Sequence, residues 1–511
     1  MRKKSLLCLW PLVAALSVTP CIAQPVAPDT KPESVEALRA EVAGLRHQLD
    51  TQRREFDARL REMEAKFAAI ETAAAKVPAP AGQVSAAAAV APPRPELAER
   101  SRVLPGRLGG AVQSMNPDVS AIIDLNYHAD DSKEGISHVL EALPGFDHTH
   151  GGEEEHHHGP DEGFNMSHLE LQFSAEVDPY FKGSAIAAVS EDGAEMETAE
   201  IETTSLPGGL KLRGGKFFSD FGYINAQHSH AWDFVDRPLV YQLLLGDHGL
   251  NDKGLQLSWL APTPFYLLAG IEAFQSGGES EMSFAYSGEE PLPRHDGPRL
   301  WVGWLKFGPN LPGNHGLQFG VFGATGKHQE AHDGQTENPP GVWTPDGDGI
   351  ADHWLDGDTT FWGGDFVYKY NSPKPYGQGD FTLQGEYFNR RKDLEMVGND
   401  FNPALVGNRS IANQDGYYVQ AVYGVLPRWR AGLRWEQVGL TNHIDYPDGS
   451  EFSGDASYRF GPMIDWSLSE FSRLRLQLNR GEYETDADRD GVTELYLQWV
   501  VSLGAHGAHK F

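Results

Sequence analysis

The sequence predicts an all-β fold, a 16-stranded antiparallel transmembrane β-barrel, preceded by an N-terminal α-helical coiled coil. Three observations predict this class. From about residue 119, apolar and polar residues alternate in segments of about ten residues. The connections between these segments are alternately short and long, and the chain begins with the pattern of an export signal.

The first 23 residues are predicted to be a signal peptide. Basic residues at positions 2–4 precede an apolar stretch from Leu6 to Val18, and Ala23 is a small residue suited to cleavage. The apolar stretch is too short to span a bilayer as a helix. Both cysteines of the chain lie inside this segment, so no disulfide is expected in the mature protein.

Charge and hydropathy restrict the function classes further. The formal net charge is −30, which argues against nucleic acid as a partner. After the signal, no apolar run of about 18 residues follows, so a membrane-spanning helix is not expected. For an exported membrane protein, a closed barrel is then the remaining architecture.

Residues 33–75 have the apolar spacing of a coiled coil, with steps of three and four and one eleven-residue step between Leu49 and Leu60. A lone amphipathic helix is the alternative, but an isolated helix of this length is marginal. We therefore expect a periplasmic coiled coil that self-associates, as a homo-trimer by analogy with porins. Residues 76–106 are rich in Ala and Pro and are expected to be a linker.

The barrel domain is predicted over residues 108–511. Short connections such as "DPY" at 178, "LPGG" at 206 and "LPR" at 426 alternate with long polar ones, as in bacterial outer-membrane barrels. The sixteen expected strands lie near residues 119–128, 165–177, 181–190, 195–204, 208–217, 253–260, 265–275, 299–307, 316–325, 359–370, 379–389, 415–424, 428–437, 456–467, 471–482 and 493–505.

Three stretches resemble a known family. They are "MNPDVSAIIDLNY" near the first strand, "VDPYF" at the first turn, and "LKLRGGKFFSDFGYINAQHSHAWDFVDRPLVYQLLLGDHGLNDKGLQLSWLAPTPFYLLAGIEAFQSG". Their sequence is similar to porin-like outer-membrane proteins often labelled zinc-regulated, and sometimes TonB-dependent. The resemblance implies an outer-membrane barrel and zinc-linked expression. TonB-dependent receptors carry a globular plug before 22 strands, whereas this chain resembles porins with an N-terminal periplasmic coiled coil.

Charged residues on the inward face of the predicted strands are of both signs. A wet lumen needs polar side chains of some kind, and this is one interpretation. The other is a basic wall that orients anionic or zwitterionic solutes. The candidate pore-lining residues are Lys211, Arg213, Arg428, Arg430, Arg434, Arg473, Arg475, Glu170 and Glu386.

The third outer loop, about residues 218–252, contains the apolar stretch "FVDRPLVYQLLLGDHGL". Apolar residues in such a loop predict burial, either inside the lumen as a constriction or against a neighbouring subunit. His228 and His230 in this loop could share a metal ion, or they could be hydrogen-bonded within a folded loop.

The first outer loop contains "HTHGGEEEHHHGPDEG". Neutral imidazole is a good zinc ligand, and carboxylates raise the local cation concentration, so weak zinc binding is predicted there. A solvated polar loop is the alternative. The candidate ligands are His148, His150, His156, His157, His158, Glu153, Glu154 and Glu155.

Two Asp-rich turns resemble calcium-binding loops, in which alternating carboxylates surround a hard cation. Leu497 stands where an EF-hand would have its bidentate Glu, and Asp-Gly is also an ordinary hairpin turn. The candidate residues are Asp486, Asp488, Asp490 and Glu494 in the first turn, and Asp346, Asp348 and Asp352 in the second.

These patterns favour a passive channel for small solutes in the outer membrane, with a link to uptake of zinc or another divalent metal. The alternative is an outer-membrane receptor for a metal or siderophore. A barrel hydrolase is a remote third class, since no G-x-S-x-G, H-E-x-x-H or phosphate loop occurs. No cofactor is required, Zn²⁺ and Ca²⁺ are candidate ligands, and the expected partners are membrane lipid, small solutes and further copies of the chain.

Overall fold

A computed structural model describes residues 118–133, 135–146, 162–190, 193–246, 248–277, 283–332, 336–337, 343–344, 351–485 and 489–504. The predicted signal peptide, coiled coil and linker lie outside these residues. Within them, no helix is both long enough and apolar enough to cross a membrane.

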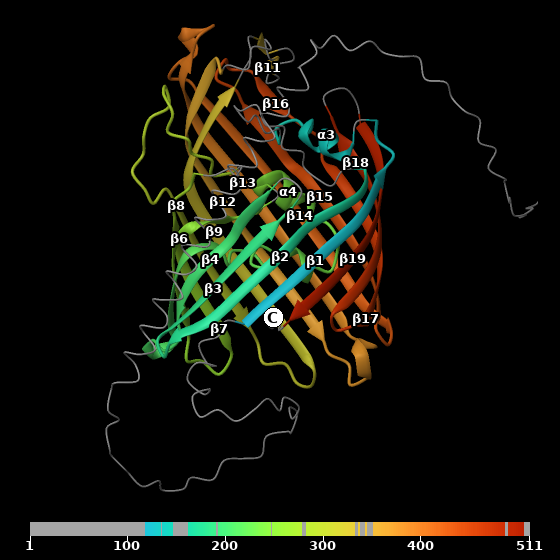
Figure 1. Cartoon of the computed structure of the whole chain (residues 1–511). Helices are drawn as coiled ribbons and strands as arrows, with labels where there is room; N and C mark the ends of the chain where they lie inside the picture. The colour runs from blue at the N-terminus through green and yellow to red at the C-terminus, as the bar shows by residue number, and fades with distance from the viewer. Residues whose placement is uncertain are drawn as a thin grey trace, which may run out of the picture. The chain divides into compact units, whose positions relative to one another are not determined.

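Sixteen antiparallel strands form a closed barrel (Figure 1). Each strand pairs with the next in the chain, and β1 pairs with both β2 and β19, which closes the ring. The strands are β1 (Asp118–Asp130), β2 (Gly163–Asp178), β3 (Phe181–Val189), β4 (Ala194–Thr203), β5 (Leu210–Phe218), β6 (Asn251–Leu260), β7 (Tyr266–Phe274), β8 (Leu300–Gly308), β9 (His315–His332), β12 (His353–Tyr370), β13 (Phe381–Asn399), β14 (Arg409–Leu426), β15 (Trp429–Asp445), β17 (Ser457–Ser469), β18 (Ser472–Glu484) and β19 (Arg489–Gly504).

Three shorter strands lie outside the ring order. β16 (Glu451–Ser453) pairs with the end of β15, and β10 (Thr336–Glu337) pairs with β11 (Trp343–Thr344). The prediction of sixteen barrel strands is confirmed, because every predicted segment coincides with one barrel strand. Both ends of the barrel lie at the rim with the short turns, which is the periplasmic rim of outer-membrane barrels.

Several strands are longer than predicted at the rim with the long loops. β13 continues to Asn399, although the sequence pattern predicted an end near residue 389. Trp362 of β12 faces outward and pairs with Asn389 of β13. Two residues further along β13, towards the long loops, the outward-facing residue is the exposed Arg391. Beyond the bilayer both faces of a strand meet water, so the alternation that predicts strands disappears there.

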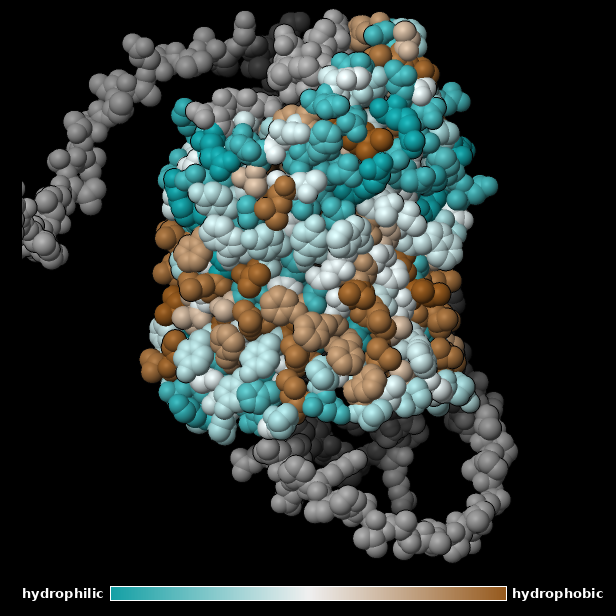
Figure 2. Space-filling view, turned by 180° about the vertical axis from the view of Figure 1, so that it is seen from behind, coloured by the Kyte–Doolittle hydropathy of each residue, from teal (hydrophilic) through white to brown (hydrophobic). Residues whose placement is uncertain are grey.

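On the face of the barrel seen in Figure 2, hydrophobic side chains form a band in the half nearer the short turns. Outward-facing residues there are apolar because lipid cannot hydrate polar groups. The barrel surface is therefore suited to contact with the interior of a lipid bilayer. Exposed residues of this kind include Leu212, Leu255, Leu257, Trp259, Ile271, Trp301, Leu305, Phe319, Val321, Trp362, Leu433, Trp435, Leu476, Leu478, Leu497 and Trp499.

The lumen is occupied by the connection between β5 and β6, residues 219–250, here called the lumen loop. It contains a 3₁₀ turn, η2 (Ser229–Ala231), and one short helix, α4 (Leu239–Leu245), six of whose seven residues are buried. The ring of Phe221 lies 4.8 Å from Phe322 and 5.7 Å from Phe388, centroid to centroid, on β9 and β13. The apolar part of the loop is thus buried as predicted, and of the two alternatives the structure shows the one inside the lumen.

A second outer segment packs over the mouth of the barrel. α3 (Ile136–Glu141) and the residues after it belong to the same hydrophobic core as the lumen loop, through Ile136, Leu140 and Phe146. Asn442 Nδ2 of β15 donates to the carbonyl oxygen of Pro144 at 2.8 Å. The first outer loop therefore contributes a fixed element to the entrance.

Candidate functional site in the loop-lined lumen

One aspartate fixes the middle of the lumen loop to the barrel wall. The Asp236 carboxylate lies 2.7 Å from Arg434 Nη2 and 2.6 Å from Arg459 Nη2, and it also accepts from Gln477 Nε2. Both arginines are 1% exposed. Glu436 of β15 pairs with both arginines and accepts from the backbone N–H of Leu239 at 2.8 Å. The two buried positive charges are therefore balanced by two carboxylates, one from the loop and one from the wall.

Glu386 of β13 holds the first part of the loop. Its carboxylate accepts from the backbone N–H groups of Tyr223 and Ile224, at 2.7 and 3.0 Å. The hydroxyls of Tyr241 and Tyr418 donate to the same carboxylate at 3.0 and 2.6 Å. A carboxylate that is 3% exposed is thus fully hydrogen-bonded, and it joins the loop to the opposite wall of the barrel.

Three further arginines of the predicted basic wall bind the lumen loop. Arg430 pairs with Asp233 of the loop at 2.7 Å and with Asp465 of β17 at 2.5 Å. Arg473 and Arg475 donate to backbone carbonyls of the loop, those of His230 and Trp232, at 2.7 and 2.8 Å. An inserted loop needs hydrogen-bond donors from the wall for its carbonyls, and the arginines supply them.

The remaining predicted pore-lining cations occupy different places. Arg213 is buried between Asp220 and Glu200, at 3.0 and 3.5 Å. Lys211 is at the short-turn rim and pairs with Glu202 at 2.9 Å. For Arg428 the pore-lining prediction was wrong. It has a φ of 67° in the turn before β15, and its guanidinium lies 4.7 Å from the centroid of the Tyr376 ring in the neighbouring turn.

A cavity of about 220 Å³ lies between the lumen loop and β12 to β15, near their short-turn ends. It is polar and carries charges of both signs. Its lining includes Asp233 and Tyr223 from the loop, and Lys369, Gln384 and Arg430 from the strands. The cavity is the part of the lumen that a solute could occupy beside the loop.

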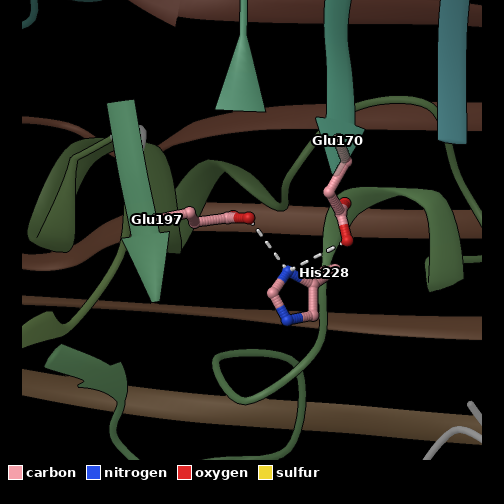
Figure 3. Close-up of side chains that lie close together, drawn as sticks. All are labelled: Glu170, Glu197 and His228. Atoms are coloured by element: carbon pink, nitrogen blue, oxygen red, sulfur yellow. Dashed lines mark hydrogen bonds and ion pairs between the residues drawn. The ribbon is translucent and has the colours of Figure 1, made fainter. Parts of the chain in front are cut away.

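His228, Glu170 and Glu197 come together at the wall formed by β2 and β4 (Figure 3). His228 Nδ1 lies 3.1 Å from Glu197 Oε2 and 3.9 Å from Glu170 Oε1. His230 Nδ1 lies 3.0 Å from the other oxygen of Glu170. The two histidines singled out in the sequence therefore share a carboxylate, and their rings stack with centroids 5.9 Å apart.

The sequence analysis missed Glu197. It lies in a β-bulge of β4, because Ile186 of β3 pairs with Thr198 while the next residue, Ala187, pairs with Met196. The bulge lets Glu197 join Thr198 on the luminal side while Met196 stays exposed to the outside. A carboxylate at an apparently lipid-facing position in "AEMETAE" was the signal that could have revealed it.

The electrostatics of this cluster favour a cation. His228 lies on the lumen loop, and burial alone would lower its pKa. The hydrogen bond to Glu197 and the negative charge of Glu170 outweigh burial, so the pKa of His228 lies above its ordinary value. Two carboxylates thus favour positive charge at this point of the wall.

Of the four candidate residues in the first Asp-rich turn, the structure describes Asp490 and Glu494. Asp490 and Glu494 lie on β19, where Asp490 is exposed and Glu494 is buried. Glu494 accepts from the hydroxyl of Tyr496 at 2.7 Å and lies 3.6 Å from Arg459. Asp352 directly precedes β12, and its backbone N–H donates to His332. Asp486, Asp488, Asp346 and Asp348 lie outside the described residues, as do the candidate zinc ligands at positions 148–158.

We predict that the loop anchor survives moderate acid. Burial raises the pKa of Asp236, but Arg434 and Arg459 lower it further, to about 2. A carboxyl whose folded pKa is depressed stabilises the folded form above its unfolded pKa of about 3.9 and loses this effect as pH falls towards the folded value. A nitroxide label on Gln227→Cys should therefore keep its mobility from pH 7 to pH 4 and loosen near pH 2. Loosening already between pH 7 and pH 5 would contradict the anchor.

Comparison with known proteins finds a relative that covers most of the chain. A protein of Aquifex aeolicus (strain VF5), named as an uncharacterized protein, is 35% identical over 402 residues, which is 77% of this chain and 80% of that protein. This chain belongs to the family of that Aquifex protein. No family model matches the chain. The relative's name states no activity, so membership of the family assigns none to this chain.

Solved structures that resemble this chain include two bacterial outer-membrane proteins and a porin. The outer membrane channel DcaP of Acinetobacter baumannii is 11% identical, with a TM-score of 0.45 over 76% of this chain and 97% of that one. OmpT of Vibrio cholerae is 12% identical, with a TM-score of 0.44 over 76% and 97%. An anion-selective porin from Comamonas acidovorans is 12% identical, with a TM-score of 0.42 over 76% and 99%.

Proposed function

We propose that this protein is a passive channel of the outer membrane for small solutes, and that the lumen loop sets its width. The observation that carries the proposal is a closed barrel whose polar interior is narrowed by a loop bound to the far wall. Barrels of 16 to 18 strands enclose enough space for an aqueous channel. A rigidly anchored loop inside that space limits the size of the solutes that pass.

Charge in the cavity favours small anionic or zwitterionic solutes. Its lining has one more cation than carboxylates: Lys369, Arg430 and Arg434 against Asp233 and Asp236. At about 220 Å³ the cavity is smaller than the roughly 300–1,000 Å³ of drug-sized ligand sites. A solute of a few heavy atoms with a carboxylate or phosphate group would fit this size and charge.

A metal or siderophore receptor is the second candidate. The lumen loop and its hydrophobic core occupy much of the interior, which favours binding over free diffusion. Weak zinc binding by the first outer loop, with its five histidines between positions 148 and 158, is compatible with both a channel and a receptor, and we propose it for either. The coiled coil of residues 33–75 and the trimer are proposals too, which chemical cross-linking of the full chain can test.

Recording from planar bilayers tests the channel and its selectivity. We expect conductance steps from the purified protein, and a reversal potential in a salt gradient that shifts toward cation preference in Lys369→Gln. The lost positive charge lines the cavity, so anions would be attracted less strongly. Lys211→Gln removes the same charge from the rim and should shift the potential less.

Two results would count against the proposal. A silent bilayer would favour the receptor. An unchanged reversal potential in Lys369→Gln would place the cavity away from the conduction path.

A further inference from the structure

Three side chains from three segments present metal-ligating atoms to one point of the lumen wall. Glu170 comes from β2, Glu197 from the bulge in β4, and His228 from the lumen loop (Figure 3). The three ligand atoms all lie within 4.8 Å of one another. A zinc ion about 2.0–2.2 Å from each ligand needs them roughly 3.3–4 Å apart, so only small side-chain shifts would close the site.

A buried oxygen of Glu170 points to a missing ligand. Among the described residues, Glu170 Oε1 has no hydrogen-bond partner, although the residue is only 1% exposed. Its other oxygen is bound by His230 at 3.0 Å, which fixes the orientation of the carboxylate. An oriented carboxylate with an unsatisfied buried oxygen is costly in a stable protein, and a bound ion or an ordered water removes that cost.

We propose that Glu170, Glu197 and His228 bind one divalent cation of the zinc class at the lumen wall. One imidazole nitrogen with two carboxylate oxygens suits zinc better than calcium or magnesium, which take oxygen ligands alone. Three protein ligands leave a fourth position for water or for an anionic solute. The inference goes beyond the proposed function, because this site can bind its ion whether or not the lumen conducts.

The ion can reach this site from the lumen. The side chains of Glu197 and His228 are 22% and 20% exposed, whereas that of Glu170 is 2% exposed. Glu170 therefore forms the base of the site, and the other two form its open side. The site is separate from the first outer loop, whose histidines would bind zinc loosely and in several geometries.

The test combines location with stoichiometry on the full-length protein. Crystals soaked in ZnCl₂ and measured at the zinc absorption edge should show an anomalous peak between the three ligands. Equilibrium dialysis with Zn²⁺ should show that Glu197→Gln and His228→Asn each weaken one tight equivalent by more than roughly tenfold. His295→Asn is a matched control, because His295 pairs with Asp356 at 2.9 Å elsewhere in the barrel, and it should bind zinc like the wild type.

Three results would overturn the proposal. They are no anomalous peak between the three ligands, a peak only in the first outer loop, or tight zinc binding that is unchanged in both folded variants. The wild-type anomalous map decides the question even if a variant fails to fold. A protein that shows this peak but no conductance in planar bilayers would contradict the proposed channel while supporting the metal site.

Discussion

Replacing residues 226–246 by a short Gly/Ser linker should raise the single-channel conductance several-fold. These residues include α4 and the anchoring Asp236, which together fill the lumen and bridge it to β15 and β17. The barrel should survive, because β5 and β6 pair directly from Leu210–Trp259 to Phe218–Asn251. Arginines that now bind the loop would then be hydrated in a water-filled channel.

The matched control changes an outer hairpin that stays out of the lumen. Residues 446–449 form the turn between β15 and β16, and replacing them by Gly/Ser should leave conductance unchanged. A loop replacement that inserts into bilayers with wild-type conductance would mean that the lumen loop does not limit flow.

Asp236→Asn should loosen the lumen loop by about 3 kcal/mol, the lower end of the cost of removing one partner from a buried ion pair. The lost carboxylate faces Arg434 and Arg459, both fully buried. Glu436 stays within 3.1 and 2.6 Å of the two arginines, which limits the effect. Hydrogen exchange of the α4 amides measures it, and the amides should exchange roughly a hundredfold faster.

Asp233→Asn is the comparison for that measurement. Its partner Arg430 has a side chain that is 32% exposed and keeps Asp465, so solvent screening should make the effect smaller. Equal exchange rates in Asp236→Asn and the wild type would show that the ion pairs do not hold the loop.

Much of the barrel was predictable because the bilayer imposes its own pattern. Where a strand separates lipid from a polar lumen, its residues must alternate, and segments such as "LRLQLN" in β18 show this directly. The same constraint explains the errors at strand ends. Above the bilayer, Arg390 points inward and Arg391 outward on β13, so no alternation marks that part of the strand.

The site was predictable only in part. His228 and His230 stood out by their spacing, and the apolar sequence of their loop indicated burial. Their carboxylate partners come from β2 and β4, and Glu197 reaches the site only through a bulge, which alternation cannot predict. The alternation of residues along the strands predicted which arginines face inward. It could not predict whether an arginine contacts solute or the lumen loop, because that depends on contacts between residues about 200 positions apart in the chain, such as Arg434 and Asp236.

Liposome swelling with solutes of graded size tests the central claim most directly. Purified protein in liposomes should admit small amino acids and organic acids without an energy source, at rates that fall steeply as solute size increases. The loop-replaced protein should admit larger solutes than the wild type. Swelling at the background rate for every solute, in the wild type and in the loop-replaced protein alike, would contradict a passive channel governed by the lumen loop.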